Sequence, residues 1–101
     1  MTQLMEEILT IVRYQLDIPL VDQESYTQRF LTHLKYFCSR ILTQEHTQSL
    51  TDPVMLEMMQ SRYPKAYQVT EVIATYLQKK YHYHVAEDEK VYLTIHLARL
   101  N

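Results

Sequence analysis

The chain has 101 residues, of which 47% are hydrophobic, which is enough for one domain with a buried core and too few for two. Its formal net charge is −2, from 10 basic and 12 acidic side chains, and the basic residues form no run that could follow a phosphate backbone. These values argue against intrinsic disorder and against direct binding of RNA or DNA by this chain alone.

Glycine is absent, and the three prolines, Pro19, Pro53 and Pro64, stand where helical patterns break. A β-rich chain would need more residues suited to tight turns, so the composition predicts an all-α fold. The single cysteine, Cys38, lies in an apolar helical pattern and can form no internal disulfide. No signal peptide or membrane-spanning run is visible, so we expect a reducing, cytoplasmic location and no membrane contact.

Two helices are predicted in the first half of the chain. Apolar residues recur at helical spacing from about Thr2 to Leu16, and Pro19 prevents this helix from continuing. The longest helix is predicted from roughly Gln23 to Leu42, and a polar, aperiodic loop, 43–51, follows it. The second helix has an apolar seam made of Phe30, Leu34, Phe37 and Ile41.

Three further helices are predicted in the second half. Asp52 followed by Pro53 is typical of a helix start, and this short helix ends near Arg62. A fourth helix runs from Pro64 to about Tyr81. The fifth, 87–100, opens with acids and closes with a basic residue, as the helix dipole favours. Short connections between five helices predict a compact five-helix bundle of antiparallel helices around one core.

Two features of this half have more than one interpretation. The methionines of the third helix, Met55, Met58 and Met59, are interpreted as core filler, although flexible methionines also suit a surface that repacks against a partner. His82 and His84 lie in a connection interpreted as a mobile hinge. Two histidines are too few for a structural zinc site, so we expect no metal and no cofactor.

Two other histidines lie beside arginines at helical spacing. His96 falls between two apolar faces of the last helix, one turn before Arg99. His33 has Arg29 and Arg40 within a quarter turn of it in helical projection. A neighbouring cation lowers the proton affinity of an imidazole, which suits a neutral ring that acquires negative charge. The alternative for either histidine is a ring satisfied at the edge of the core.

These histidine segments carry a family resemblance. The ending YLTIHLARL behind an acidic run, together with YTQRFLTHLKYFCSR upstream, resembles the PTS regulation domain (PRD) of BglG/LicT/SacY-type transcriptional antiterminators. The resemblance covers residues 1–101 as a single domain, and the ending resembles the second of two tandem copies more than the first. It implies the same five-helix fold and a homodimer with the histidines near the shared face.

The resemblance also implies which residues are modified. His33 and His96 match the two phosphorylatable histidines of the family, and Arg40 and Arg99 match basic residues of the same motifs. Arg29 is added as a phosphate neighbour from helical geometry. The implied phosphoryl donors are the phosphocarrier HPr and the EIIB domain of a sugar permease. RNA would be bound only by a separate N-terminal domain.

The leading hypothesis is therefore a regulatory domain whose histidine phosphorylation controls dimerisation and hence antitermination. No catalytic constellation is recognisable, so we do not expect an enzyme. One alternative is a constitutive helical dimerisation module whose histidines only pack. Another is the same domain within a DNA-binding, PTS-regulated activator of sugar operons.

Overall fold

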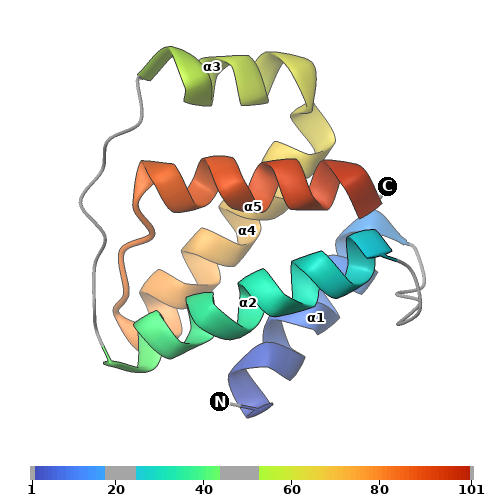
Figure 1. Cartoon of the computed structure of the whole chain (residues 1–101). Helices are drawn as coiled ribbons and strands as arrows, with labels where there is room; N and C mark the ends of the chain where they lie inside the picture. The colour runs from blue at the N-terminus through green and yellow to red at the C-terminus, as the bar shows by residue number, and fades with distance from the viewer. Residues whose placement is uncertain (1, 18–24, 44–52, 101) are drawn as a thin grey trace.

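Five helices account for almost all of the chain that the structure describes (Figure 1). This computed structural model describes residues 2–17, 25–43 and 53–100. The helices are α1 (Thr2–Leu16), α2 (Ser25–Thr43), α3 (Pro53–Arg62), α4 (Pro64–Tyr81) and α5 (Glu87–Leu100). The predicted all-α five-helix fold is confirmed. The predicted start of the second helix at Gln23 and most of the loop at 43–51 lie outside the described residues, whereas Thr43 is the last residue of α2.

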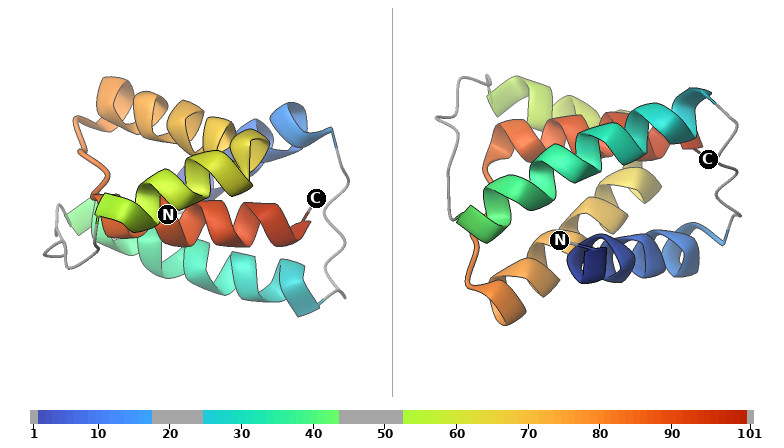
Figure 2. Two further views of the ribbon diagram at one scale, coloured as in Figure 1. Left: turned by 90° about the horizontal axis from the view of Figure 1, so that it is seen from above. Right: turned by 60° about the horizontal axis from the view of Figure 1, so that its bottom comes forward.

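Helix α5 lies in the middle of the bundle and is covered from several sides. It contacts α2, α3 and α4, while α1 packs against α2 and α4 (Figures 1 and 2). Helices α2 and α5 lie side by side and run in opposite directions, whereas α3 and α5 run in the same direction. The central position of α5 explains why it is apolar on two faces, as its sequence predicted.

The core is built from the apolar seams of four helices. All four residues of the predicted α2 seam are buried, and so is Cys38 beside them. The stripe of α4 and the leucines of α5 complete the same cluster, whose members include Ile8, Val12, Phe30, Leu34, Phe37, Ile41, Val69, Ile73, Leu77, Leu93 and Leu97. At one point the core is polar, because the hydroxyls of Thr70 and Thr94 lie 2.9 Å apart between α4 and α5.

Two helices end in a left-handed residue that is not glycine. Asp17, directly after α1, has a φ of 54°, and His82, directly after α4, has a φ of 53°. Both positions keep a backbone hydrogen bond to the preceding helix, from Asp17 N–H to the carbonyl of Arg13 and from His82 N–H to the carbonyl of Leu77. Both helices therefore end in the left-handed conformation that glycine usually adopts at this position. Asp17 and His82 adopt it at a steric cost, because each has a β-carbon.

The connection between α4 and α5 differs from the mobile hinge expected from sequence. Tyr83 and Val85 are buried and belong to the core cluster, while His82 and His84 are exposed. The alternation of buried and exposed side chains shows an extended segment with one face on the core. No group of three or more metal-binding side chains occurs among the described residues.

Helix α3 also differs in part from its interpretation as core filler. Met59 is 7% exposed and packs inward, but Met58 is 46% exposed, and Met55 and Val54 are exposed as well. The helix has apolar residues all round, and only one side of it faces α5 (Figure 2). The core-filler prediction is therefore correct for Met59 and wrong for Met55 and Met58.

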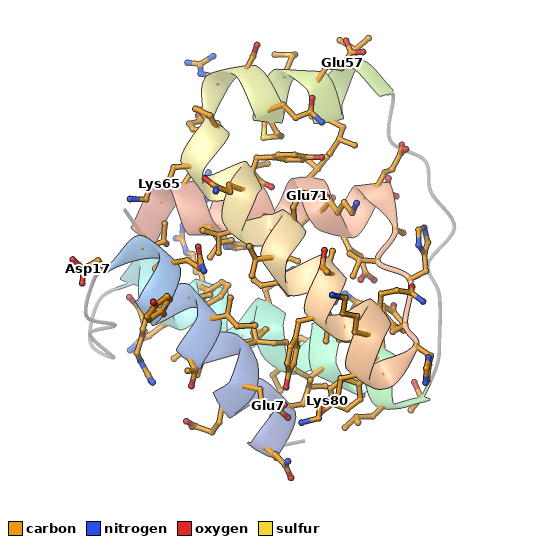
Figure 3. All side chains as sticks on the ribbon, turned by 180° about the vertical axis from the view of Figure 1, so that it is seen from behind. Glu7, Asp17, Glu57, Lys65, Glu71 and Lys80 are labelled. Carbon is orange, nitrogen blue, oxygen red and sulfur yellow. The ribbon has the colours of Figure 1, made fainter. Side chains whose placement is uncertain are left out.

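A polar cluster joins the start of α1 to the end of α4. Glu7 accepts hydrogen bonds from the Lys80 ammonium and, at 2.7 Å, from the Tyr81 hydroxyl (Figure 3). The hydrogen bond from Lys80 lowers the pKa of the Glu7 carboxyl. These contacts hold α1 and α4 together at this end of the bundle. None of the described helices has the length and apolar character needed to span a membrane.

Candidate functional site

The antiparallel pair α2 and α5 brings the two sequence-selected histidines into contact. The imidazole rings of His33 and His96 are stacked, with centroids 4.8 Å apart and planes inclined by 25°. Aromatic rings surround them: Phe37 stacks against His33 at 6.4 Å, Tyr92 lies 6.1 Å from His33, and Phe30 lies 6.4 Å from His96. Both histidine rings are half-buried. The pair forms one site, although each residue was selected separately.

The surroundings of the two rings keep them neutral. Burial, the neighbouring His96 and the charge of Arg40 together lower the pKa of His33 to about 4. Burial and then the charge of Arg99 lower the pKa of His96. Two stacked imidazoles at this distance would repel each other strongly if both were protonated. At neutral pH each ring therefore keeps a lone pair on one nitrogen.

One nitrogen of His33 has an unusual environment. The Nε2 atom is buried, and no described residue forms a hydrogen bond with it. A polar atom buried without a partner costs stability, and a functional role is one reason for a protein to keep it. A group that reacts at this nitrogen therefore requires the ring to turn or α2 and α5 to separate locally.

Arg40 lies beside His33, and its guanidinium is held by a buried acid of α5. Its Nε donates a hydrogen bond to Oε1 of Glu89 at 2.9 Å, and the Glu89 side chain is only 4% exposed. Burial, and next the charge of Glu89, raise the pKa of Tyr83 to about 12, and Tyr83 also shares a hydrogen bond with Glu89. Glu89 can therefore be buried, because Arg40 compensates its charge.

The other two arginines lie in different surroundings. Arg29 is exposed and lines a hollow together with Gln28, Thr32, His33 and His96. Arg99 lines a separate hollow between α3 and α5, together with Met59 and Tyr63. The structure therefore brings Arg29 together with both histidines, leaves Arg40 next to His33 in an ion pair, and places Arg99 by His96 on the side of α3.

The sequence reading missed Glu89, Thr32 and Gln28 as members of this region. A spacing signal for Glu89 was present: Arg40 follows His33 by seven positions, and Glu89 precedes His96 by seven. Seven residues are about two helical turns, so antiparallel helices that pair the histidines also pair the arginine with the glutamate. Thr32 and Gln28 carried no comparable signal, because polar residues on an exposed helix face are common.

The site contains no activated nucleophile of the serine or cysteine type. Cys38 is the only thiol of the chain, and it is fully buried, which raises its pKa to about 11. A thiol in this state is inert at neutral pH. What the site offers chemically is a pair of neutral imidazoles, a nearby guanidinium and small polar donors, which together suit the acceptance of an anionic group.

Comparison with known proteins agrees with the motif resemblance. The family model described as PRD domain matches residues 6–100. The chain is 37% identical to the transcription antiterminator LicT of Bacillus subtilis over 98% of its own length and 34% identical to the beta-glucoside operon antiterminator of Dickeya chrysanthemi over the same share. It is 31% identical to protein GlcT of Staphylococcus aureus over 79% of its length.

The chain spans only about a third of these relatives, covering 35% of the first two and 28% of the third. The agreement therefore concerns one domain of longer proteins. Since the family model matches nearly the whole chain, including both histidine segments, this chain belongs to the PRD domain family.

Proposed function

We propose that this domain regulates a transcriptional antiterminator by accepting phosphoryl groups on His33 and His96 from PTS proteins. HPr and the EIIB domain of a sugar permease are the proposed donors. The observation that carries the proposal is the stacked pair of neutral imidazoles in a half-buried position between α2 and α5. Antiterminators are named among the relatives, which supports the same role for the protein that contains this domain.

The chemistry requires little from the domain itself. The lone pair of a neutral imidazole nitrogen attacks the phosphorus of a phosphohistidine or phosphocysteine on the donor. A new N–P bond forms, the donor N–P or S–P bond breaks, and the donor histidine or thiolate leaves with the electron pair. The acceptor ring loses its N–H proton to solvent, so that the ring is neutral and the phosphoryl group carries the negative charge, and a departing donor histidine takes up a proton. Lowered pKa values at both rings keep the attacking lone pair available.

A phosphoryl group at this position changes the contact between α2 and α5. It adds up to about two negative charges and three acceptor oxygens to a site whose rings are packed together. The exposed rings of Tyr36 and Tyr92 lie beside the same histidine and offer apolar surface to a second copy of the chain. We propose that phosphorylation shifts the monomer–dimer equilibrium through this surface, and that RNA is bound by a separate domain in the cytoplasm.

Phosphotransfer with purified components tests the acceptor role. The domain is incubated with radiolabelled phosphoenolpyruvate, Enzyme I and HPr, with and without EIIB. We expect label on the wild type and none on a His33→Ala/His96→Ala double variant. His82→Ala/His84→Ala is the matched control, because these exposed histidines lie outside the site and their loss should leave labelling unchanged. Absence of label on the wild type with either donor refutes the proposal.

Sedimentation distinguishes the switch from a constitutive dimerisation module. His33→Asp and His96→Asp place a fixed negative charge at each acceptor. The proposed switch predicts a monomer–dimer equilibrium that differs from that of the wild type by about one order of magnitude or more. A module whose histidines only pack predicts equal equilibria for folded variants, so the helix content of each variant is measured by circular dichroism alongside.

A further inference from the structure

Two separate hollows border the His33 side chain. One is lined by Gln28, Arg29, Thr32, His33 and His96, and the other by His33, Tyr36, Arg40, Asp88, Glu89 and Tyr92. A phosphoryl group on His33 that leaves α2 and α5 in place would lie in one of them or at the boundary between them. The charged residues that line the two hollows differ, so the structure indicates which hollow suits a phosphoryl group better.

The hollow that contains Arg40 is unfavourable for a dianion. Two carboxylates, Asp88 and Glu89, line it, against the single guanidinium of Arg40. That guanidinium already forms an ion pair with Glu89, whose carboxylate is buried. Drawing Arg40 away would leave the Glu89 charge buried and uncompensated, which is strongly destabilising. Arg40 is close enough to lower the pKa of His33, but its Nε is already bonded to Glu89.

The hollow that contains Arg29 has the opposite character. Among the described residues that line it, none is acidic, and Arg29, Thr32 and Gln28 all carry hydrogen-bond donors. Arg29 lies four positions before His33, and helical side chains lean toward the N-terminus of their helix. His33 and Arg29 line the same hollow, so a group on the His33 ring can lie next to Arg29. An exposed arginine there can reach an anion without breaking a buried contact.

We propose that Arg29, assisted by Thr32 and Gln28, holds the phosphoryl group of phosphorylated His33, whereas Arg40 remains the structural partner of Glu89. This inference rests on the proposed phosphoryl-acceptor function. It assigns the binding of the phosphoryl group to Arg29, which was selected from helical geometry. It does not assign that role to Arg40, which matches the family motif. The geometry that points to it is the separation of acids and donors into two hollows beside one ring.

The test compares phosphoryl transfer to His33 in variants of the two hollows. All are made in a His96→Gln background, so that His33 is the only acceptor of the pair, and phosphorylated HPr is the probe. The share of label on the domain at equilibrium and the half-life of the label after donor removal are measured. Arg29→Gln removes the proposed ligand, and Arg29→Lys keeps its charge. Arg40→Gln/Glu89→Gln replaces the ion pair by a neutral pair without changing net charge.

We expect Arg29→Gln to lower the equilibrium constant for labelling about tenfold and to shorten the half-life of the label, because a charge-assisted hydrogen bond is lost. Arg29→Lys should restore part of the loss. For Arg40→Gln/Glu89→Gln, the equilibrium constant for labelling and the half-life of the label should stay within about twofold of the values for the His96→Gln background. The inference is overturned if Arg29→Gln labels as the background does, or if the neutral pair loses as much as Arg29→Gln while folded by circular dichroism. If the wild type takes no label from either donor, the proposed function itself fails.

Discussion

Arg40 of α2 and the buried Glu89 of α5 form a partly buried ion pair, with 2.9 Å between Nε and Oε1, two turns along the helices from the stacked pair His33 and His96. Both pairs depend on the same alignment of the antiparallel helices α2 and α5, so the ion pair helps to keep the two histidines opposite each other. A displacement of α5 along α2 that separated the histidines would also break the ion pair. The contact between the histidines is therefore held by a charge–charge interaction outside the site.

Removing one member of this ion pair should destabilise the fold. Arg40→Gln leaves Glu89 buried without its cation, and we expect the free energy of unfolding at pH 7 to fall by about 3 kcal/mol. Arg40→Gln/Glu89→Gln should recover most of that loss, since two amides can bond to each other. Urea unfolding followed by circular dichroism measures both. A double variant as unstable as the single one would show that packing, not charge, is responsible.

The stability of the domain should depend on pH through His33. The pKa of this ring is lowered to about 4 in the folded state, below its ordinary value of 6.5. Between pH 6.5 and 4 the unfolded chain therefore binds a proton that the folded chain does not, so folded-state stability falls as the pH falls through this range and is unaffected above it. We expect the stability of wild type relative to His33→Gln to fall by about 2 kcal/mol from pH 7.5 to 4.5, which is less than the full shift gives because solvent screens a half-buried ring.

The measurement is urea unfolding of both proteins at each pH. Subtracting the variant removes the titration of the acids that the two proteins share. A difference that does not change with pH would contradict the neutral state of His33.

Cys38 should be unreactive in the folded protein. Its side chain is fully buried, and burial raises the pKa of the thiol to about 11. A rise of about two units lowers the thiolate fraction at pH 7 roughly a hundredfold, before access is considered. Reaction with a thiol-specific chromogenic reagent should therefore be at least about a hundredfold slower in buffer than in concentrated urea. Fast labelling of the folded protein would mean that α2 opens readily.

Two adjacent methionines of α3 should respond differently to truncation. Met59 is 7% exposed and Met58 is 46% exposed. Met59→Ala should lower the free energy of unfolding by about 2 kcal/mol or more, because it leaves a space in packed surroundings. Met58→Ala should change it by less than about 0.5 kcal/mol. Thermal unfolding of the two variants side by side provides the comparison, and equal losses would contradict the orientation of α3.

The helices could be predicted from sequence because their signals are local. Pro53 and Pro64 mark two helix starts, and the spacing of Phe30, Leu34 and Phe37 follows the helical period. The two histidines could be selected for the same reason, since each has an arginine at helical spacing. Their contact could not be derived in this way, because the register between α2 and α5 is a tertiary property.

The residues that were misjudged depend on which elements lie next to them. Tyr83 is in a connection without helical period, and only its place over the core buries it. Met55 and Met58 are as apolar as Met59, but the packing of α3 on α4 and α5 leaves them exposed. Glu89 reads as a solvated residue at the start of a helix until Arg40 is placed opposite it. Local pattern gives the character of a side chain, whereas its surroundings decide its exposure.

The left-handed conformations of Asp17 and His82 lower the stability of the domain, so substitutions at these two positions can raise its free energy of unfolding. A β-carbon in this conformation costs roughly 1 kcal/mol, and a chain without glycine bears that cost at the end of both α1 and α4. Glycine at these two exposed positions, which line neither of the two hollows beside His33, would relieve the strain. The domain can therefore be stabilised for biophysical work without changing His33 or His96, the two proposed phosphoryl acceptors.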